Sequence, residues 1–167
     1  MTTRAVIALG ANLGDRAATL AAAARALGEL PNTSLVATSA FYESAAVKPE
    51  GVDLTAPEYL NGVALIDTDL SPEELLAAIA GLEVQFGRVR HERWGDRTLD
   101  LDIIAYDQLQ QADDHLTLPH PRAHERSFVL VPWLDVDPLA ELPQGMVAEL
   151  AAAVAHEVRP YEAKAVN

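Results

Sequence analysis

A cluster of charged side chains lies in the second half of the chain. It contains four arginines followed closely by two aspartates: Arg88, Arg90, Arg93, Arg97, Asp100 and Asp102. Arginine binds phosphate oxygens bidentately, and aspartate oxygens are preferred ligands of Mg²⁺. The cluster therefore predicts a site for a phosphorylated polyanion that carries divalent metal. The alternative is a solvated surface loop that runs into a strand with its polar residues facing outward.

The two aspartates have the spacing of residues that share one face of a strand. Side chains two residues apart in a strand point the same way, so Asp100 and Asp102 are expected together, roughly 7 Å apart at Cα from a rise of about 3.3 Å per residue. This spacing suits one shared ion, or two ions about 3.5–4 Å apart as in two-metal phosphoryl-transfer sites. Because no histidine accompanies them in the strand, Mg²⁺ is expected rather than Zn²⁺.

The four arginines precede this strand as a segment without regular periodicity. The chain contains neither a Gly-x-x-x-x-Gly-Lys-Ser/Thr loop nor a Gly-x-Gly-x-x-Gly loop, so phosphate charge must be neutralised by side chains and metal. We expect the arginine segment to close as a lid over a phosphoryl donor and to exclude water. Salt bridges to the acidic surface are the alternative role for any one of these arginines.

A second basic cluster surrounds a histidine between two prolines. Pro119 and Pro121 hold His120 in an extended backbone, and Arg122 and Arg126 follow four residues apart, a spacing that places them on one face of a helical turn. A lone histidine is usually structural. We interpret this one as functional because rigid backbone and neighbouring cations would fix its imidazole toward an anion.

A flat molecule that accepts the phosphoryl group would need a site in which aromatic and amide side chains lie together. Tyr59 and Asn61 alternate onto one face of an expected strand, where a ring and an amide could meet a heteroaromatic molecule. Phe128 and the segment 44–47 are further candidates. The structural alternative is that Tyr59 belongs to the core.

Composition excludes several classes of protein. The chain has 167 residues, a formal net charge of −13 and no cysteine, so neither a disulfide framework nor a thiolate metal site is possible. A strongly acidic chain is unsuited to general nucleic-acid binding. Its apolar runs fall short of the roughly 18 residues of a membrane helix, and its start does not resemble a signal peptide. We expect a single cytoplasmic domain covering residues 1–167.

Hydrophobic patterning predicts the elements that position these residues. Strands are expected over 4–10, 33–42, 59–68 and 98–106, with helices over 16–30 and 72–86, the second opened by a capping box at Ser71 and ended by Gly87. Segment 43–57 is expected to be a loop. The order β-α-β-β-α-β predicts an α+β, ferredoxin-like sandwich with helices packed on a mainly antiparallel sheet. Beyond it we expect an extended segment over 116–121, a short helix over 128–134 and an extra C-terminal helix over 146–158.

Taken together, these motifs resemble the 6-hydroxymethyl-7,8-dihydropterin pyrophosphokinase family of folate biosynthesis. The string Arg-Trp-Gly-x-Arg-Thr-Leu-Asp-Leu-Asp over 93–102 is highly specific to that family. The other matching segments occur in the same order along most of the chain: 8–15, 41–44, 59–61, 87–90, 119–122 and 126–128.

The resemblance implies transfer of the β,γ-pyrophosphoryl unit of ATP to the pterin hydroxymethyl oxygen, with release of AMP. It assigns two Mg²⁺ ions to Asp100 and Asp102, which with Arg88 and Arg97 form the catalytic set. The residues it implies for ATP binding are Arg88, Arg90, Arg93, Arg97, His120, Arg126 and Glu83. Those it implies for pterin binding are Ser44, Ala45, Val47, Tyr59, Asn61, Trp94 and Phe128.

Two other interpretations of the same residues stay open. A metal-dependent phosphohydrolase or nucleotidyltransferase would use the same aspartate pair. A ferredoxin-like regulatory domain would sense a small anion without turnover. In the favoured interpretation the partners are ATP and the dihydropterin, with neither nucleic acid nor membrane, and the protein is expected to be a monomer.

Overall fold

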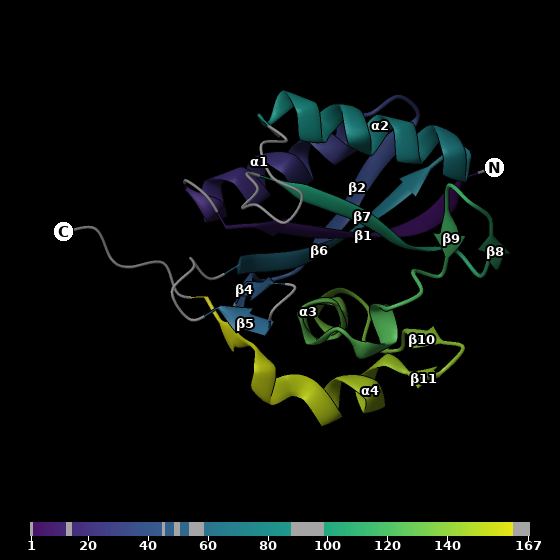
Figure 1. Ribbon diagram of the computed structural model, residues 1–167. Coiled ribbons are helices and arrows are strands. Elements are labelled where there is room, and N and C mark those ends of the chain that lie inside the picture. The colour runs from purple at the N-terminus through teal and green to yellow at the C-terminus, as the bar shows by residue number, and fades with distance from the viewer. Residues whose placement is uncertain are drawn as a thin grey trace.

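A sheet with helices on both faces makes up the part of the chain that the computed structural model describes, residues 2–12, 15–44, 46–48, 51–53, 59–87 and 99–161 (Figure 1). The strands of the main sheet are β1 (Thr3–Ala11), β2 (Thr33–Thr38), β3 (Tyr42–Ser44), β6 (Tyr59–Thr68), β7 (Asp100–Tyr106) and β12 (Arg159–Pro160). The α-helices are α1 (Arg16–Gly28), α2 (Pro72–Gln85), α3 (Ser127–Val136) and α4 (Val147–Val154).

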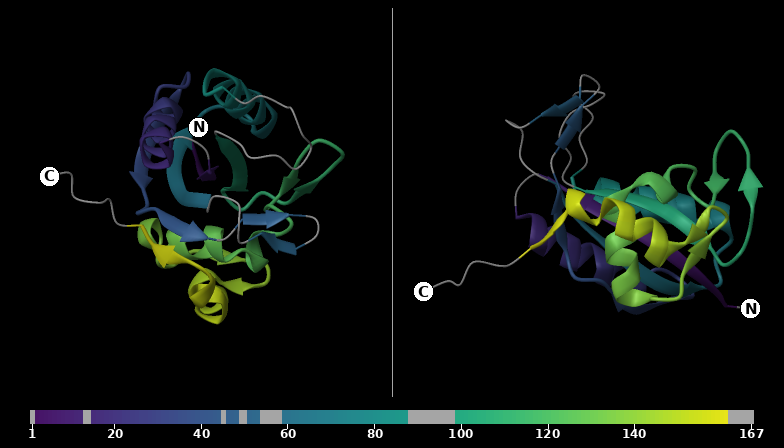
Figure 2. Two further views of the ribbon diagram at one scale, coloured as in Figure 1. Left: turned by 60° about the vertical axis from the view of Figure 1, so that its left-hand side comes forward. Right: turned by 90° about the horizontal axis from the view of Figure 1, so that it is seen from below.

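The strand order is β12-β3-β6-β1-β7, and β2 pairs with the other half of β6. Every pairing within this sheet is antiparallel. Three short hairpins lie outside this sheet: β4 (Ala46–Lys48) with β5 (Gly51–Asp53), β8 (Gln111–Ala112) with β9 (Thr117–Leu118), and β10 (Glu141–Leu142) with β11 (Gly145–Met146). Figure 2 shows β4 and β5 standing away from the main sheet.

The predicted helix boundaries rest on local capping that the structure confirms. Asp15 accepts a hydrogen bond of 3.1 Å from the Ala18 N–H and begins α1. Ser71 and Glu74 form the predicted capping box at the start of α2. Just past its end, Gly87 has a φ of 82°, a conformation that glycine adopts without steric cost.

Apolar side chains fill both faces of the sheet. On one face, Leu20 of α1 and Leu75 of α2 pack against Ile7, Leu101 and Ile103. On the other, α3 and α4 pack through a separate cluster that includes Val63, Leu130, Trp133 and Val147. Figure 1 shows this layering, with α1 and α2 above the sheet and α3 and α4 below it. Leu99, Leu101 and Ile103, at alternate positions just before and within β7, are buried.

Three predicted segments need correction. The single strand expected over 33–42 is divided into β2 and β3, because Ser39 breaks the run: its N–H donates to the Val63 carbonyl, and its hydroxyl accepts from the Val63 N–H. The loop expected over 43–57 contains the end of β3 and the β4–β5 hairpin. The last helix is shorter than expected and passes into a 3₁₀ turn, η2 (Ala155–Glu157), before β12.

The structure adds one finding on membrane association. Among the described residues, none of the helices combines the length and the apolar character needed to cross a bilayer.

Candidate functional site

A row of residues in direct register crosses four strands at one end of the sheet. Asp100 of β7 pairs with Gly10 of β1, Gly10 pairs with Asn61 of β6, and Asn61 pairs with Tyr42 of β3. Directly paired residues lie on the same face of a sheet. The aspartate and the amide therefore flank Gly10 on one face, separated by two strand spacings, roughly 10 Å.

Gly10 is required in this row by the close approach of its neighbour. A Cβ atom at this position would lie 2.8 Å from Nδ2 of Asn61, nearer than real Cβ contacts allow. The missing side chain lets the Asn61 amide lie over strand β1. Asn61 is itself 8% exposed, and its Oδ1 accepts a hydrogen bond of 3.3 Å from the Ser44 hydroxyl.

The predicted carboxylate pair lies on the face that carries this row. Asp102 is exposed and Asp100 is half-buried, while Leu101 between them is buried on the opposite face. Within the described part of the chain no cluster contains three or more candidate metal ligands from His, Cys, Asp and Glu. Two carboxylates nevertheless suit Mg²⁺, which commonly takes one or two protein oxygens together with substrate phosphates and water.

A buried glutamate supports the strand that carries both aspartates. Glu83 of α2 is 7% exposed, and its Oε2 accepts a hydrogen bond of 3.0 Å from the N–H of Leu101. This contact lies on the helix side of β7, beneath the Asp-Leu-Asp sequence. The placement supports a role for Glu83 in fixing the strand, and its expected contact with nucleotide stays a prediction.

The second basic cluster lies within electrostatic range of Asp102. The N–H of His120 donates to the Ile104 carbonyl over 2.8 Å, which fixes this histidine beside β7. Nδ1 of His120 accepts from the Arg122 N–H at 3.2 Å, so the proton of the neutral ring resides on Nε2. Burial lowers the pKa of His120, the charge of Asp102 opposes that shift, and Arg126 and Arg122 add to it.

Arg126 belongs to this cluster and contacts Phe128, a residue of the expected acceptor site. Its guanidinium lies 5.6 Å from the ring centroid of Phe128. Burial is the main cause that lowers the pKa of Arg126, and the negative charge of Asp102 raises it. Asp102, His120 and Arg126 are therefore within electrostatic reach of one another, as expected for a site that binds phosphate.

The predicted pterin residues are brought together in part. Tyr59 pairs directly with Ser44, and both share the face of Asn61. Tyr59 is half-buried rather than part of the core. Phe128 lies in the first turn of α3, the helix that covers this face.

Several predicted site residues lie outside the described residues. These are Ala45, Arg88, Arg90, Arg93, Trp94, Arg97 and, for its side chain, Val47. Their roles, and the expected closing of the arginine segment, stay predictions.

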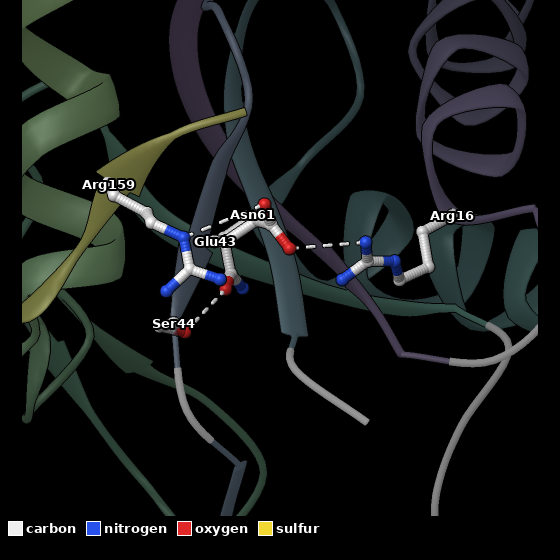
Figure 3. A network of polar contacts seen from close by, with 5 residues as sticks. All are labelled: Arg16, Glu43, Ser44, Asn61 and Arg159. Carbon is white, nitrogen blue, oxygen red and sulfur yellow. Dashed lines mark hydrogen bonds and ion pairs between the residues drawn. The ribbon is translucent and has the colours of Figure 1, made fainter. Parts of the chain in front are cut away.

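A charged network behind β3 has no counterpart among the sequence predictions. Glu43 contacts Arg16 through Oε2 at 3.3 Å and Arg159 through Oε1 at 3.8 Å, so one carboxylate joins three segments that are far apart in the chain (Figure 3).

A second contact that the sequence did not predict joins β3 to α3. The Tyr42 hydroxyl donates to Asp135 over 2.7 Å, and burial together with this bond raises the pKa of Tyr42 to about 12.

The chain matches known proteins in family, in sequence and in structure. The family described as 7,8-dihydro-6-hydroxymethylpterin-pyrophosphokinase (HPPK) matches residues 6–138. The chain is 43% identical to the 2-amino-4-hydroxy-6-hydroxymethyldihydropteridine pyrophosphokinase of Haemophilus influenzae over 143 residues, covering 86% of this chain and 87% of that one. It is 41% identical to the protein of the same name from Pseudomonas aeruginosa over 158 residues, covering 94% and 95%.

Solved structures show likeness in fold. A wild-type Plasmodium falciparum HPPK-DHPS with pterin and p-hydroxybenzoate superposes with a TM-score of 0.71 at 16% identity. The match covers 93% of this chain and 44% of that one, so the chain spans less than half the length of that protein.

Proposed function

The chain belongs to the 7,8-dihydro-6-hydroxymethylpterin-pyrophosphokinase (HPPK) family, and from this premise we propose how its residues divide the work of the reaction. The enzyme is a pyrophosphokinase of folate biosynthesis, which transfers pyrophosphate from ATP to the hydroxymethyl group of 6-hydroxymethyl-7,8-dihydropterin. The observation that carries the assignment of residues is the row across β7, β1 and β6. Asp100, the proposed metal ligand, and Asn61, the proposed acceptor ligand, lie in register on one face with Gly10 between them.

The donor side of the site is built on β7. Asp100 and Asp102 would hold two Mg²⁺ ions, which would supply positive charge to neutralise the phosphates of ATP. The exposed carboxylate of Asp102 and the oxygen-only donor pair support this assignment. Glu83 holds the strand beneath them.

Arginine and histidine side chains would align the donor phosphates. The charge of Asp102 acts on both Arg126 and His120, which would contact the phosphates directly. Arg88, Arg90, Arg93 and Arg97 would close over the nucleotide and exclude water, which protects a phosphoryl donor from hydrolysis.

The acceptor side is built on β6 and β3. The pterin ring would lie between Tyr59 and Phe128, with Trp94 beside it. Its polar edge would be read by the Asn61 amide, by Ser44 and by the backbone at Ala45 and Val47. Because Ser44 donates to Oδ1 of Asn61, the amide NH₂ group is turned toward Gly10 and the donor side.

The reaction itself asks the protein for alignment and charge neutralisation. The pterin hydroxymethyl oxygen forms a bond to the β-phosphorus as the bond from that phosphorus to the α,β-bridging oxygen breaks. AMP departs with that oxygen, and the hydroxyl proton is lost. This displacement needs no covalent enzyme intermediate.

The same premise extends to architecture. The strand order β7-β1-β6-β2 with a helix after β1 and after β6 supports a ferredoxin-like fold for a single domain over 1–167. We further propose a monomer, which light scattering would test. The requirement for ATP favours a cytoplasmic location.

One experiment separates this function from the two other interpretations. The purified protein is mixed with ATP, Mg²⁺ and 6-hydroxymethyl-7,8-dihydropterin, and nucleotides are separated by chromatography. AMP that forms only with the pterin present supports the pyrophosphokinase. Pterin-independent ADP or AMP would indicate hydrolysis, and complete absence of turnover would favour a sensor.

A further inference from the structure

The carboxylate of Glu43, on the opposite face of β3 from the proposed acceptor site, joins three distant segments of the chain. Glu43 lies in β3, Arg16 is the first residue of α1, and Arg159 begins β12. Each guanidinium approaches a different carboxylate oxygen, at 3.3 Å for Arg16 and 3.8 Å for Arg159. Figure 3 shows the two arginines reaching Glu43 from opposite sides.

The network has a second connection through the C-terminal segment. The guanidinium of Arg16 lies 5.8 Å from the ring centroid of Tyr161, and the Tyr161 N–H donates to the Phe41 carbonyl at 2.9 Å. Arg159 also pairs in register with Glu43. The last described residues of the chain therefore hold β3 both through backbone hydrogen bonds and through charge.

Alternation along β3 places this network directly behind the acceptor site. Glu43 points to the side of α1, whereas its neighbours Tyr42 and Ser44 point to the side of Asn61. Any shift of β3 that follows loss of the Glu43 contacts would move the Ser44 hydroxyl, which sets the orientation of the Asn61 amide.

The degree of burial indicates which contact matters more. The side chains of Glu43 and Arg16 are 18% and 23% exposed, whereas that of Arg159 is 62% exposed. Exposed ion pairs contribute little because water and salt screen them, and partly buried pairs at shorter distance contribute more. Arg16 is therefore the stronger partner of Glu43.

We propose that Glu43 is a positioning residue for the pterin, acting with Arg16 and Arg159 to fix β3 so that Ser44 and Asn61 present their polar groups in register. This inference rests on the proposed function. Glu43 itself is assigned no contact with substrate. Its effect on the reaction is selective for the acceptor, because β6 and β1 separate β3 from the donor groups on β7.

The test compares Glu43→Gln with Asp67→Asn, a matched control. Asp67 also lies on a strand of the sheet and pairs with an arginine, Arg4 at 2.6 Å, but it stands near the opposite end of β6 from Asn61. The KM of the pterin is measured at saturating ATP, and that of ATP at saturating pterin. Equilibrium dialysis gives the pterin Kd, and thermal unfolding reports stability.

For Glu43→Gln we expect the KM and Kd of the pterin to rise on the order of tenfold, with the KM of ATP within twofold of wild type. Asp67→Asn should leave the KM and Kd of the pterin and the KM of ATP within twofold of wild type. This should hold even if its Tm falls as far as that of Glu43→Gln. Arg16→Gln should resemble Glu43→Gln, Arg159→Gln should show a smaller rise, and Arg159→Lys should restore the wild-type value.

The kinetic pattern distinguishes support from refutation. An unchanged pterin KM in Glu43→Gln and Arg16→Gln, or an equal rise for pterin and ATP, would overturn the inference. If Glu43→Gln does not fold, Arg16→Gln replaces it and is judged by the same criterion. Failure of the proposed function is distinguishable, since the wild type itself would then form no pterin-dependent AMP.

Discussion

Oε2 of Glu83 accepts a hydrogen bond from the backbone N–H of Leu101, the residue that separates Asp100 from Asp102. β7 stands at the end of the strand order, so this N–H finds its acceptor on a helix rather than on a neighbouring strand. A buried carboxylate is costly unless hydrogen bonds compensate it. The position of the two aspartates thus depends on a polar contact within the core.

Glu83→Leu should impair both stability and turnover. The substitution leaves the Leu101 N–H without this acceptor in a buried position, which costs about 1–3 kcal/mol of unfolding free energy. Relaxation of β7 would then displace both aspartates, and we expect kcat to fall on the order of 100-fold. Urea denaturation and AMP formation measure the two effects.

Glu83→Gln separates the hydrogen bond from the charge. Its side-chain carbonyl can still accept from Leu101, so we expect most of the stability and activity to be retained. Glu73→Gln, at an exposed position on the same helix, serves as the control and should behave as wild type. Equal losses in Glu83→Leu and Glu73→Gln would contradict the role given to Glu83.

Local signals in the sequence predicted most of the fold. Residues 59–68 form the strand that hydrophobic patterning predicted. Asp15 and Ser71 begin their helices because capping depends on residues within one turn. The aspartate pair was placed on one face by the two-residue period of a strand alone.

Contacts between distant segments could not be predicted in the same way. The pairing of Arg159 with Glu43 spans most of the chain, and a two-residue strand has no periodicity to detect. The division between β2 and β3 depends on the Ser39 hydroxyl meeting Val63 of another strand. In each case the determining partner comes from tertiary structure, which a single sequence does not display.

Asp100→Asn should abolish turnover without unfolding the protein. The side chain is half-buried on the face opposite Leu101, and an amide lacks the negative charge with which the carboxylate would attract Mg²⁺. We expect kcat to fall at least about 1,000-fold, in line with loss of a group that stabilises the transition state. AMP formation is followed across a Mg²⁺ titration, with circular dichroism to verify the fold.

Asp107→Asn is the matched control for this aspartate. Asp107 follows the same strand and has a φ of 50°, a conformation that asparagine tolerates well. The variant should therefore keep wild-type activity. Substantial turnover in Asp100→Asn at wild-type Mg²⁺ concentration would remove the basis for the metal assignment.

Tyr42→Phe should alter the stability of the protein at alkaline pH. Burial and the bond to Asp135 raise the pKa of Tyr42 from 10.0 to about 12 in the folded state. Because the folded pKa is the higher one, the stabilisation is fully present below pH 10 and is lost as the pH rises toward about 12. The phenylalanine variant should lose about 1 kcal/mol at pH 8 and show a flatter decline above pH 10.

Urea denaturation between pH 8 and 11.5 measures both effects. Tyr106→Phe is a suitable control because its hydroxyl donates to the Leu70 carbonyl, an uncharged acceptor, at 2.6 Å. Its loss of stability at pH 8 measures what removal of a tyrosine hydroxyl hydrogen bond to a neutral acceptor costs. Parallel pH profiles for wild type and Tyr42→Phe would show that the Tyr42–Asp135 bond does not govern this range.

Gly10→Ala tests the row that joins the donor and acceptor sides. The new Cβ would lie 2.8 Å from Nδ2 of Asn61, so the amide must move away from strand β1. Since the amide is proposed to read the pterin, the KM of the pterin should rise by roughly 10-fold or more while the KM of ATP changes little.

Gly81→Ala is the control, because nothing lies within 4 Å of its added Cβ and α2 continues through it. Alanine favours a helix interior over glycine by about 1 kcal/mol, so Gly81→Ala should be as stable as wild type or more so, with unchanged kinetics. A Gly10→Ala enzyme with the wild-type pterin KM would mean that Asn61 can retreat without loss, and that the amide does not set the acceptor position.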